Sequence, residues 1–352
     1  MENPPTDPKR FGLLPALDHF SRSLGLALSD KNGLEQFVQH LSDTAAKHQK
    51  NQILIHGLRI QTMFAYFAAA LGGCQIIQEE DSGDFFAASD NLKRPDFRIL
   101  LHTGQEMFVE VKNFNQADPL EPYILDAEYA HQLRDYSIAF KKPLLFAIYW
   151  RRWGIWTLNS LKCFKFDGTQ YSLLLTETAK NDQKGLLGDR LIGITKPLTF
   201  RLYTDPSHVR KIDADGQCQF KVEKAVLTAG GREITDEIEQ RLGWYFFLYG
   251  AWADIEQPGH VVDGELLWMD MEPKREDPNP EQIFLLVGNL SEMICRQFNS
   301  VTTDQGKVTR LAPETNPAKF GAKIPKGFRG EVLGVWQFEL KPDENIFADQ
   351  FI

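Results

Sequence analysis

Three ionisable residues stand where two neighbouring β-strands would bring them together. Asp96 directly precedes the apolar run 97–101, and Glu110 and Lys112 lie within the run 107–114. Side chains alternate along a strand, so Glu110 and Lys112 share one face. Two adjacent carboxylates repel each other unless a cation lies between them, and Mg²⁺ prefers oxygen ligands. Such an ion polarises a phosphoryl oxygen and lowers the pKa of a bound water. The pattern therefore predicts metal-dependent hydrolysis of phosphodiesters.

The surrounding sequence predicts the elements that would position these residues. The polar, glycine-containing segment 102–106 is typical of a turn, so 97–101 and 107–114 are expected to form a hairpin. A helix is predicted over 56–71, because Gly72 and Gly73 follow it as helix-ending residues. Further elements are predicted as a strand at 74–78, a helix at 120–140 and a buried strand at 143–150.

The pattern Pro95-Asp96 followed by Glu110-x-Lys112 resembles the PD-(D/E)xK nuclease superfamily, whose members are restriction-endonuclease-like. The resemblance covers roughly residues 51–160. It implies an α/β fold with an αβββαβ core, in which helices flank a mixed central sheet. The predicted order of helix, three strands, helix and strand agrees with that core.

The resemblance also implies the roles of the residues. Asp96, Glu110 and Lys112 would be catalytic. Asp96 and Glu110 would bind Mg²⁺ or Mn²⁺ together with the carbonyl of Val111, and Lys112 would orient or activate the hydrolytic water.

Three further residues are candidates for auxiliary roles. Many members of the superfamily carry a metal-binding glutamate on the first helix, where this chain has Gln61, and an amide is a poorer ligand for a hard cation. Gln132 and Tyr136 resemble the Gln-xxx-Tyr element of recombination exonucleases in the superfamily. The alternative readings are a surface residue for Gln61, a solvated helix position for Gln132 and a half-buried core position for Tyr136.

Candidate nucleic-acid contacts are cations near the predicted core. Lys93 and Arg94 precede Asp96, while Arg151 and Arg152 lie between two predicted strands. Arginine suits phosphate oxygens, but two exposed arginines at a hairpin tip are an equally good interpretation. The net charge of −9 argues against a histone-like coat protein, and a nuclease would need local positive charge near its cleft.

The 352 residues are enough for more than one domain. We expect an N-terminal helical segment over 1–50, a nuclease-like domain over 51–205 and an α+β domain over 206–352 that serves substrate recognition or dimerisation. The last range contains predicted helices at 234–252 and 282–298, strands at 218–227 and 331–340, and a strand pair within 258–271. A further strand is predicted at 198–203, just before that range begins.

Compartment is inferred from what the sequence lacks. The four cysteines are dispersed without a CxxC pair, which fits a reducing cytoplasm. No apolar run is judged long enough to cross a bilayer, and the N-terminus is polar. We therefore expect a cytoplasmic protein that makes no membrane contact.

The first hypothesis is a Mg²⁺- or Mn²⁺-dependent nuclease that hydrolyses DNA in restriction, phage defence, repair or recombination. The second is a catalytically inactive nuclease-fold subunit that binds DNA or serves assembly, which Gln61 and the acidic composition favour slightly. The third is a small-molecule enzyme in which the acids and the lysine coincide by chance. RNA as a substrate and a homodimer remain open.

Overall fold

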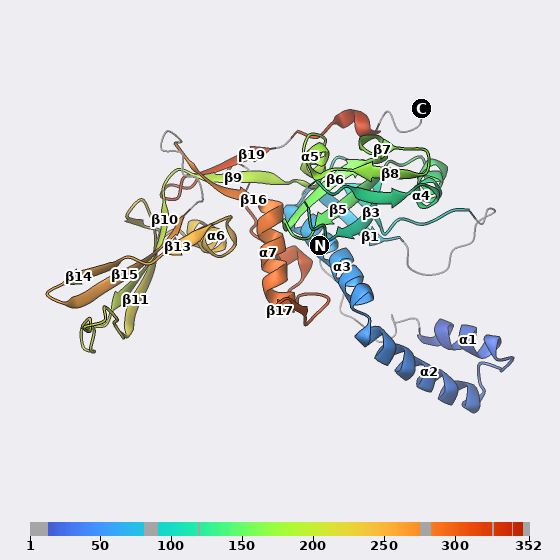
Figure 1. Cartoon of the computed structure of the whole chain (residues 1–352), viewed down its shortest axis with the longest axis horizontal. Helices are drawn as coiled ribbons and strands as arrows, with labels where there is room; N and C mark the ends of the chain where they lie inside the picture. Colours follow the sequence, from blue (N-terminus) through green and yellow to red (C-terminus); the bar gives the residue numbers. More distant parts are fainter. Residues whose placement is uncertain are drawn as a thin grey trace.

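A computed structural model describes residues 13–80, 91–118, 120–274, 283–325, 327–339 and 341–347 (Figure 1). It contains helices and several β-sheets, so the predicted mixed α/β class is confirmed. An α/β body lies between two projections, a helical pair formed by α1 and α2 and a second large sheet at the opposite end (Figure 1).

The central sheet of the body has the strand order β1-β2-β3-β5-β6. β1, β2 and β3 pair antiparallel, β3 and β5 pair parallel, and β5 and β6 form a hairpin. The strands are β1 (Cys74–Glu79), β2 (Phe97–Leu101), β3 (Glu106–Phe114), β5 (Leu144–Trp150) and β6 (Ile155–Ser160). The predicted hairpin and the predicted strand after the second helix are therefore present, and β3 lies in the interior of the sheet.

Helices cover both faces of this sheet. α3 (Gln52–Leu71) packs on the face that carries Val109 and Val111, whereas α4 (Ala127–Phe140) packs on the face that carries Phe108. This division matches the alternation predicted for β3. α3 begins four residues earlier than predicted, because the Asn51 side chain caps it, and it ends at Gly72 with a positive φ of 83°.

The prediction of one helix over 120–140 is wrong in its first part. Residues Tyr123–Asp126 form a short strand, β4, that pairs with β8 (Gln170–Leu173), and β8 also pairs with β7 (Lys165–Phe166). The helix starts only at Ala127, where the Asp126 side chain accepts a hydrogen bond from the Tyr129 amide. This cap fixes the first turn of α4 and so decides which side chains reach the centre of the sheet.

Two further sheets are built mainly from the C-terminal part. One has the order β16-β9-β19, and the other has the order β12-β11-β10-β15-β13 with β14 beside β15. Their strands are β9 (Arg190–Ile194), β10 (Leu198–Thr204), β11 (Val222–Ala229), β12 (Arg232–Glu233), β13 (Asp254–Glu256), β14 (Gly259–Val262), β15 (Glu265–Lys274), β16 (Leu285–Asn289) and β19 (Val335–Glu339). A small pair joins β17 (Thr303–Asp304) and β18 (Lys307–Val308). β9 and β10 precede residue 205 but pair with strands that follow it, so strand pairing joins both sides of the expected boundary.

Helices α6 (Glu237–Tyr249) and α7 (Leu290–Thr302) complete the C-terminal part. The predicted helix over 282–298 is wrong at its start, because Leu285–Asn289 form strand β16 before α7 begins. α7 packs against α3 (Figure 1). The Arg59 side chain of α3 donates hydrogen bonds to Thr302 at 2.8 Å and to Asn299 at 2.5 Å. The C-terminal helix therefore braces the helix that covers the central sheet.

The N-terminal part contains α1 (Leu13–Ser23) and α2 (Lys31–Lys50), which pack against each other through Phe20 and Phe37. A short helix, α5 (Leu175–Thr178), follows β8.

By length and composition α3 could cross a membrane, which the sequence analysis did not expect. Its Phe64 and Phe67 are nevertheless packed in the core against Trp156 of β6. The Arg59 guanidinium is also buried and hydrogen-bonded to α7. These contacts are those of a core helix in a water-soluble fold.

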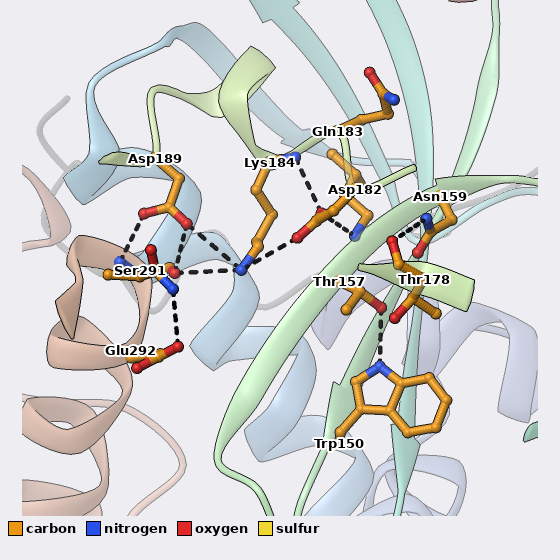
Figure 2. Close-up of polar contacts among 12 residues, drawn as sticks. Trp150, Thr157, Asn159, Thr178, Asp182, Gln183, Lys184, Asp189, Ser291 and Glu292 are labelled. Atoms are coloured by element: carbon orange, nitrogen blue, oxygen red, sulfur yellow. Dashed lines mark hydrogen bonds and ion pairs between the residues drawn. The ribbon is translucent and has the colours of Figure 1, made fainter. Parts of the chain in front are cut away.

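A buried ion network ties the end of the central sheet to the start of α7 (Figure 2). The Lys184 side chain is 5% exposed, and its ammonium lies 3.4 Å from Asp182 and 3.5 Å from Asp189. Asp189 also accepts a 2.6 Å hydrogen bond from the Ser291 hydroxyl. Burial alone would lower the pKa of Lys184, but the two carboxylates outweigh it and raise that pKa, so the ammonium stays charged.

We expect Lys184→Met to lower the free energy of unfolding by about 3 kcal/mol, because it leaves two buried carboxylates without their cation. Chemical denaturation at neutral pH measures this loss. Lys180→Met is the matched control, since the Lys180 side chain is 69% exposed in its pairing with Glu177 and its loss should cost less than about 0.5 kcal/mol. Equal stability of the two variants would show that the network contributes nothing.

Candidate active site

The pairing of β2 with β3 places the two predicted acids opposite each other. Phe97 of β2 pairs with Val109 of β3, so the preceding residue Asp96 faces Glu110. Oδ2 of Asp96 accepts a 2.6 Å hydrogen bond from the backbone N–H of Val111. Asp96 is 7% exposed and Glu110 is 3% exposed. The Asp96 and Glu110 carboxylates, which are 14 residues apart in the sequence, therefore lie side by side and are largely shielded from water.

Lys112 closes the site by binding to the second acid. Its ammonium donates a 2.7 Å hydrogen bond to Oε1 of Glu110 and a 2.8 Å hydrogen bond to the hydroxyl of Tyr129. The Tyr129 hydroxyl in turn donates to the same Oε1 of Glu110. An acid, an ammonium and a phenol thus form a closed triangle, and the Lys112 side chain remains 23% exposed to a ligand.

Tyr129 is the residue of this site that the sequence analysis missed. It lies in the first turn of α4, which the sequence placed well inside a longer helix. A lone tyrosine carries no spacing signal. Only the start of α4 at Ala127, set by the Asp126 cap, shows that Tyr129 points from the helix N-terminus towards β3.

Gln61 reaches the site from α3. Its side-chain amide donates a 2.6 Å hydrogen bond to Oδ1 of Asp96. Gln61 therefore lies next to Asp96, as the resemblance predicted. The alternative prediction, that Gln61 is an ordinary surface residue, does not agree with this hydrogen bond. As a donor, the amide supports the charge of Asp96 instead of adding a third acid.

The phenols around the acids are held neutral. Burial raises the pKa of Tyr129, and the negative charge of Glu110, its hydrogen bond and the charge of Asp96 raise that pKa further. Burial and the charge of Glu110 also raise the pKa of Tyr123. Both hydroxyls therefore keep their protons at physiological pH, and that of Tyr129 donates its proton to Glu110. The shared effect of Asp96 and Glu110 on Tyr129 also shows that both acids lie close to it.

Lys93 lies beside the same tyrosine. Its ammonium sits 4.0 Å from the centroid of the Tyr129 ring, and that of Lys112 sits 4.3 Å from it. The backbone N–H of Lys93 donates a 3.3 Å hydrogen bond to the carbonyl of Gln132, which fixes the approach of this segment to α4. A predicted nucleic-acid contact is therefore part of the immediate surroundings of the acids.

The three predicted arginines lie on two different segments, one before β2 and the other between β5 and β6. Arg94 is close enough to Tyr136 to lower its pKa, although burial and Glu80 raise that pKa overall. Arg151 and Arg152 are exposed in the turn between β5 and β6. After burial, Arg151 is the next cause of the lowered pKa of His56, which places this arginine near the first turns of α3.

Gln132 and Tyr136 of α4 form hydrogen bonds to the segment before β2 and to the end of β1. Gln132 donates a 3.1 Å hydrogen bond to Asn91, and the Tyr136 hydroxyl donates a 2.6 Å hydrogen bond to Glu80. Tyr136 is also packed edge-on against Phe108. These hydrogen bonds tie α4 to the end of β1 and to the segment before β2, and a role next to the metal stays a prediction.

The donor atoms present fit a hard divalent cation. Val111 directs its N–H towards Asp96, and in an extended strand its carbonyl points to the same side. Within the described residues, Oε2 of Glu110 accepts no hydrogen bond. In that part of the chain, no three or more His, Cys, Asp or Glu side chains lie close enough together to hold a metal ion by themselves. Two carboxylates and one carbonyl leave room for water, which is the coordination that Mg²⁺ favours.

Comparison with known proteins adds little to this geometry. No family model and no curated protein matches the chain. A solved structure similar to part of it is Hjc of Archaeoglobus fulgidus, a Holliday junction resolvase from an archaeal hyperthermophile. The match covers 27% of this chain and 79% of the resolvase, with 17% sequence identity and a TM-score of 0.22. So slight a likeness carries no argument, and the functional case depends on the site.

We expect Gln61→Glu to destabilise the metal-free protein by about 1–3 kcal/mol, because it replaces a donor to Asp96 by a third acid. Added Mn²⁺ should then raise the unfolding temperature of this variant more than that of the wild type. Thermal unfolding with Mn²⁺ and with EDTA measures both effects.

Gln61→Met provides the control for that experiment, because it removes the hydrogen bond without adding charge. It should lose stability but gain no additional response to Mn²⁺. Wild-type stability of Gln61→Glu in EDTA would contradict the placement of Gln61 against Asp96.

Proposed function

We propose that this protein is a Mg²⁺- or Mn²⁺-dependent nuclease with a restriction-endonuclease-like core, and that it hydrolyses phosphodiester bonds of DNA. The observation that carries the proposal is the meeting of Asp96, Glu110 and Lys112 at one buried point. The order helix, three strands, helix and parallel strand around that point supports the same fold, with β4 as an addition. Chance placement of these residues would not bury an acid pair against an ammonium, which disfavours the small-molecule alternative.

Each residue has a defined task in this proposal. Asp96, Glu110 and the Val111 carbonyl would hold the ion, which when bound supplies charge stabilisation and a more acidic water. The Lys112 ammonium, carried on a flexible stem, orients the attacking water and stabilises the negative charge that develops on the phosphate. Gln61 and the Val111 N–H fix the Asp96 carboxylate in one orientation.

Substrate binding is assigned to cations near the acids. Lys93, held over the Tyr129 ring, is the nearest candidate contact for the phosphate that is cut. Arg151 and Arg152 would bind phosphates further along the strand from the turn after β5. Such local contacts are needed because the chain as a whole carries a net charge of −9.

A second candidate function is a nuclease-fold subunit that binds DNA without cutting it. The observation in its favour concerns Gln61, whose amide donates a hydrogen bond to Asp96. An acid at this position of the first helix would instead help to hold the ion. DNA binding by the same surface in the absence of cleavage would select this alternative.

We expect purified protein to cut plasmid or oligonucleotide DNA with Mg²⁺ or Mn²⁺ and to stop in EDTA. Asp96→Asn and Lys112→Met should each reduce the cleavage rate by about 100-fold or more, because they remove a metal ligand or the group that activates water. Time courses on single- and double-stranded substrates, with an RNA strand as a comparison, measure these rates.

Glu106→Gln is a matched control in that assay. Glu106 is also an acid of β3, but it pairs with Arg98 and Lys142 at the far end of the strand. Its neutralisation should leave cleavage within about two-fold of wild type. If Asp96→Asn and Lys112→Met cut DNA as fast as the wild type, the cleavage would come from a contaminant and the proposal would fail.

A separate prediction concerns the two exposed arginines. We expect Arg151→Ala and Arg152→Ala each to weaken DNA binding and to reduce the slope of log affinity against log salt by about one. Fluorescence anisotropy in EDTA measures binding without cleavage. Arg22→Ala on α1, where the side chain is 69% exposed, is the control and should leave the slope unchanged. An unchanged slope in all three variants would place the DNA elsewhere.

A further inference from the structure

Tyr129 binds Oε1 of Glu110, one of the two carboxylate oxygens through which this acid could hold a divalent ion, whereas Oε2 accepts no hydrogen bond within the described residues. Its hydroxyl donates to Oε1 of Glu110 and accepts a 2.8 Å hydrogen bond from Lys112. The same Oε1 also receives the Lys112 ammonium at 2.7 Å. Both hydrogen bonds involve a charged partner, and each is worth more than a neutral one. An ion that coordinates through this oxygen must displace at least one of them.

The two donors differ in how freely they can move. Tyr129 belongs to the first turn of α4, and its amide is held at 2.8 Å by the capping carboxylate of Asp126. Its ring is also flanked by the ammonium of Lys93. Lys112 is carried on a four-carbon stem and is partly exposed. The phenol is therefore the fixed point, and the lysine is the part that can swing.

We propose that Tyr129 is a positioning residue that competes with the divalent ion for Glu110 and then retains Lys112 beside the ion. In the metal-free protein its hydroxyl caps the carboxylate. An ion bound through that oxygen would replace the hydrogen bond from the hydroxyl to Glu110, while the hydroxyl would still accept from Lys112 and so hold the ammonium beside the attacking water. This inference rests on the proposed nuclease function, because it assigns a task to the same metal site.

The proposal has a consequence that a purely structural role would not have. Tyr129→Phe removes the competing donor, so the variant should bind Mn²⁺ about three- to ten-fold more tightly than wild type. It also frees Lys112 from its anchor, so cleavage at saturating Mn²⁺ should be about ten-fold slower or more. Loss of local packing would instead weaken metal binding and slow cleavage together.

The experiment combines two readouts on the full-length protein. Electron paramagnetic resonance of free Mn²⁺ gives the dissociation constant, and single-turnover cleavage of an oligonucleotide duplex at saturating Mn²⁺ gives the rate. Tyr171→Phe is the matched control, because its hydroxyl contacts His131 of the same helix at 3.2 Å and not the acids. It should match wild type in both measurements.

A double variant shows whether the effect passes through the acid. Tyr129→Phe should not tighten Mn²⁺ binding when Glu110→Gln is already present, because the competed oxygen is then no longer a charged ligand. Tightening that persists in this background would overturn the proposal, since the effect would then arise elsewhere.

The remaining outcomes separate this inference from the proposed function. Wild-type protein that binds Mn²⁺ and cuts DNA, with a Tyr129→Phe variant that binds Mn²⁺ equally or less tightly, overturns the competition alone. Tighter binding with an unchanged rate overturns the positioning of Lys112. Wild-type protein that binds no Mn²⁺, or binds it and cuts no nucleic acid, overturns the nuclease proposal together with the role of Tyr129.

Discussion

The hydrogen bond from the Val111 amide to the Asp96 carboxylate is the interaction on which the site depends. At the end of the β2–β3 ladder, the Val111 amide bonds to the Asp96 side chain instead of to a backbone carbonyl of β2. The backbone pairing of the two strands therefore stops just before the two acids. That substitution leaves the Val111 carbonyl beyond the last β2–β3 pair, on the same side of β3 as the Val111 N–H. Burying two carboxylates together is costly in free energy unless a cation approaches them, and the Lys112 ammonium does so by binding Glu110, while Lys93 lies nearby over the Tyr129 ring.

The rest of the fold keeps this arrangement rigid. β3 lies inside the sheet with α3 on one face and α4 on the other, so Gln61 and Tyr129 approach the acids from opposite layers. α3 is in turn held by α7 through Arg59, and α7 is held at its start by Asp189 of the buried ion network (Figure 2). The C-terminal part is thus continuous with the framework of the site, because its helix supports the element that carries Gln61.

Local patterns in the sequence sufficed for the acids and the lysine, because strand alternation alone puts Glu110 and Lys112 on one face of β3. They failed where a partner distant in the chain decides the structure. β4 is a strand only because β8 pairs with it, and β16 is a strand only because β9 does. Because the predicted helix began too early, the sequence did not show that Tyr129 lies in the first turn of α4, where the Asp126 cap places it. Lys184 carried no signal, since charged residues close together in a sequence are usually solvated, and Ser291 of α7 meets it only after folding.

The charges at the centre also bear on how many ions the site could hold. Asp96 and Glu110 supply two negative charges, which one divalent ion balances. A second ion would need a further carboxylate, and the side chain that α3 brings to Asp96 is an amide that already donates a hydrogen bond. Lys112 and Lys93 add positive charge in the remaining space, which opposes a second cation by direct repulsion. If the site binds a metal as proposed, the charges of the described residues favour a single ion beside Lys112, whose ammonium donates a hydrogen bond to the Tyr129 hydroxyl.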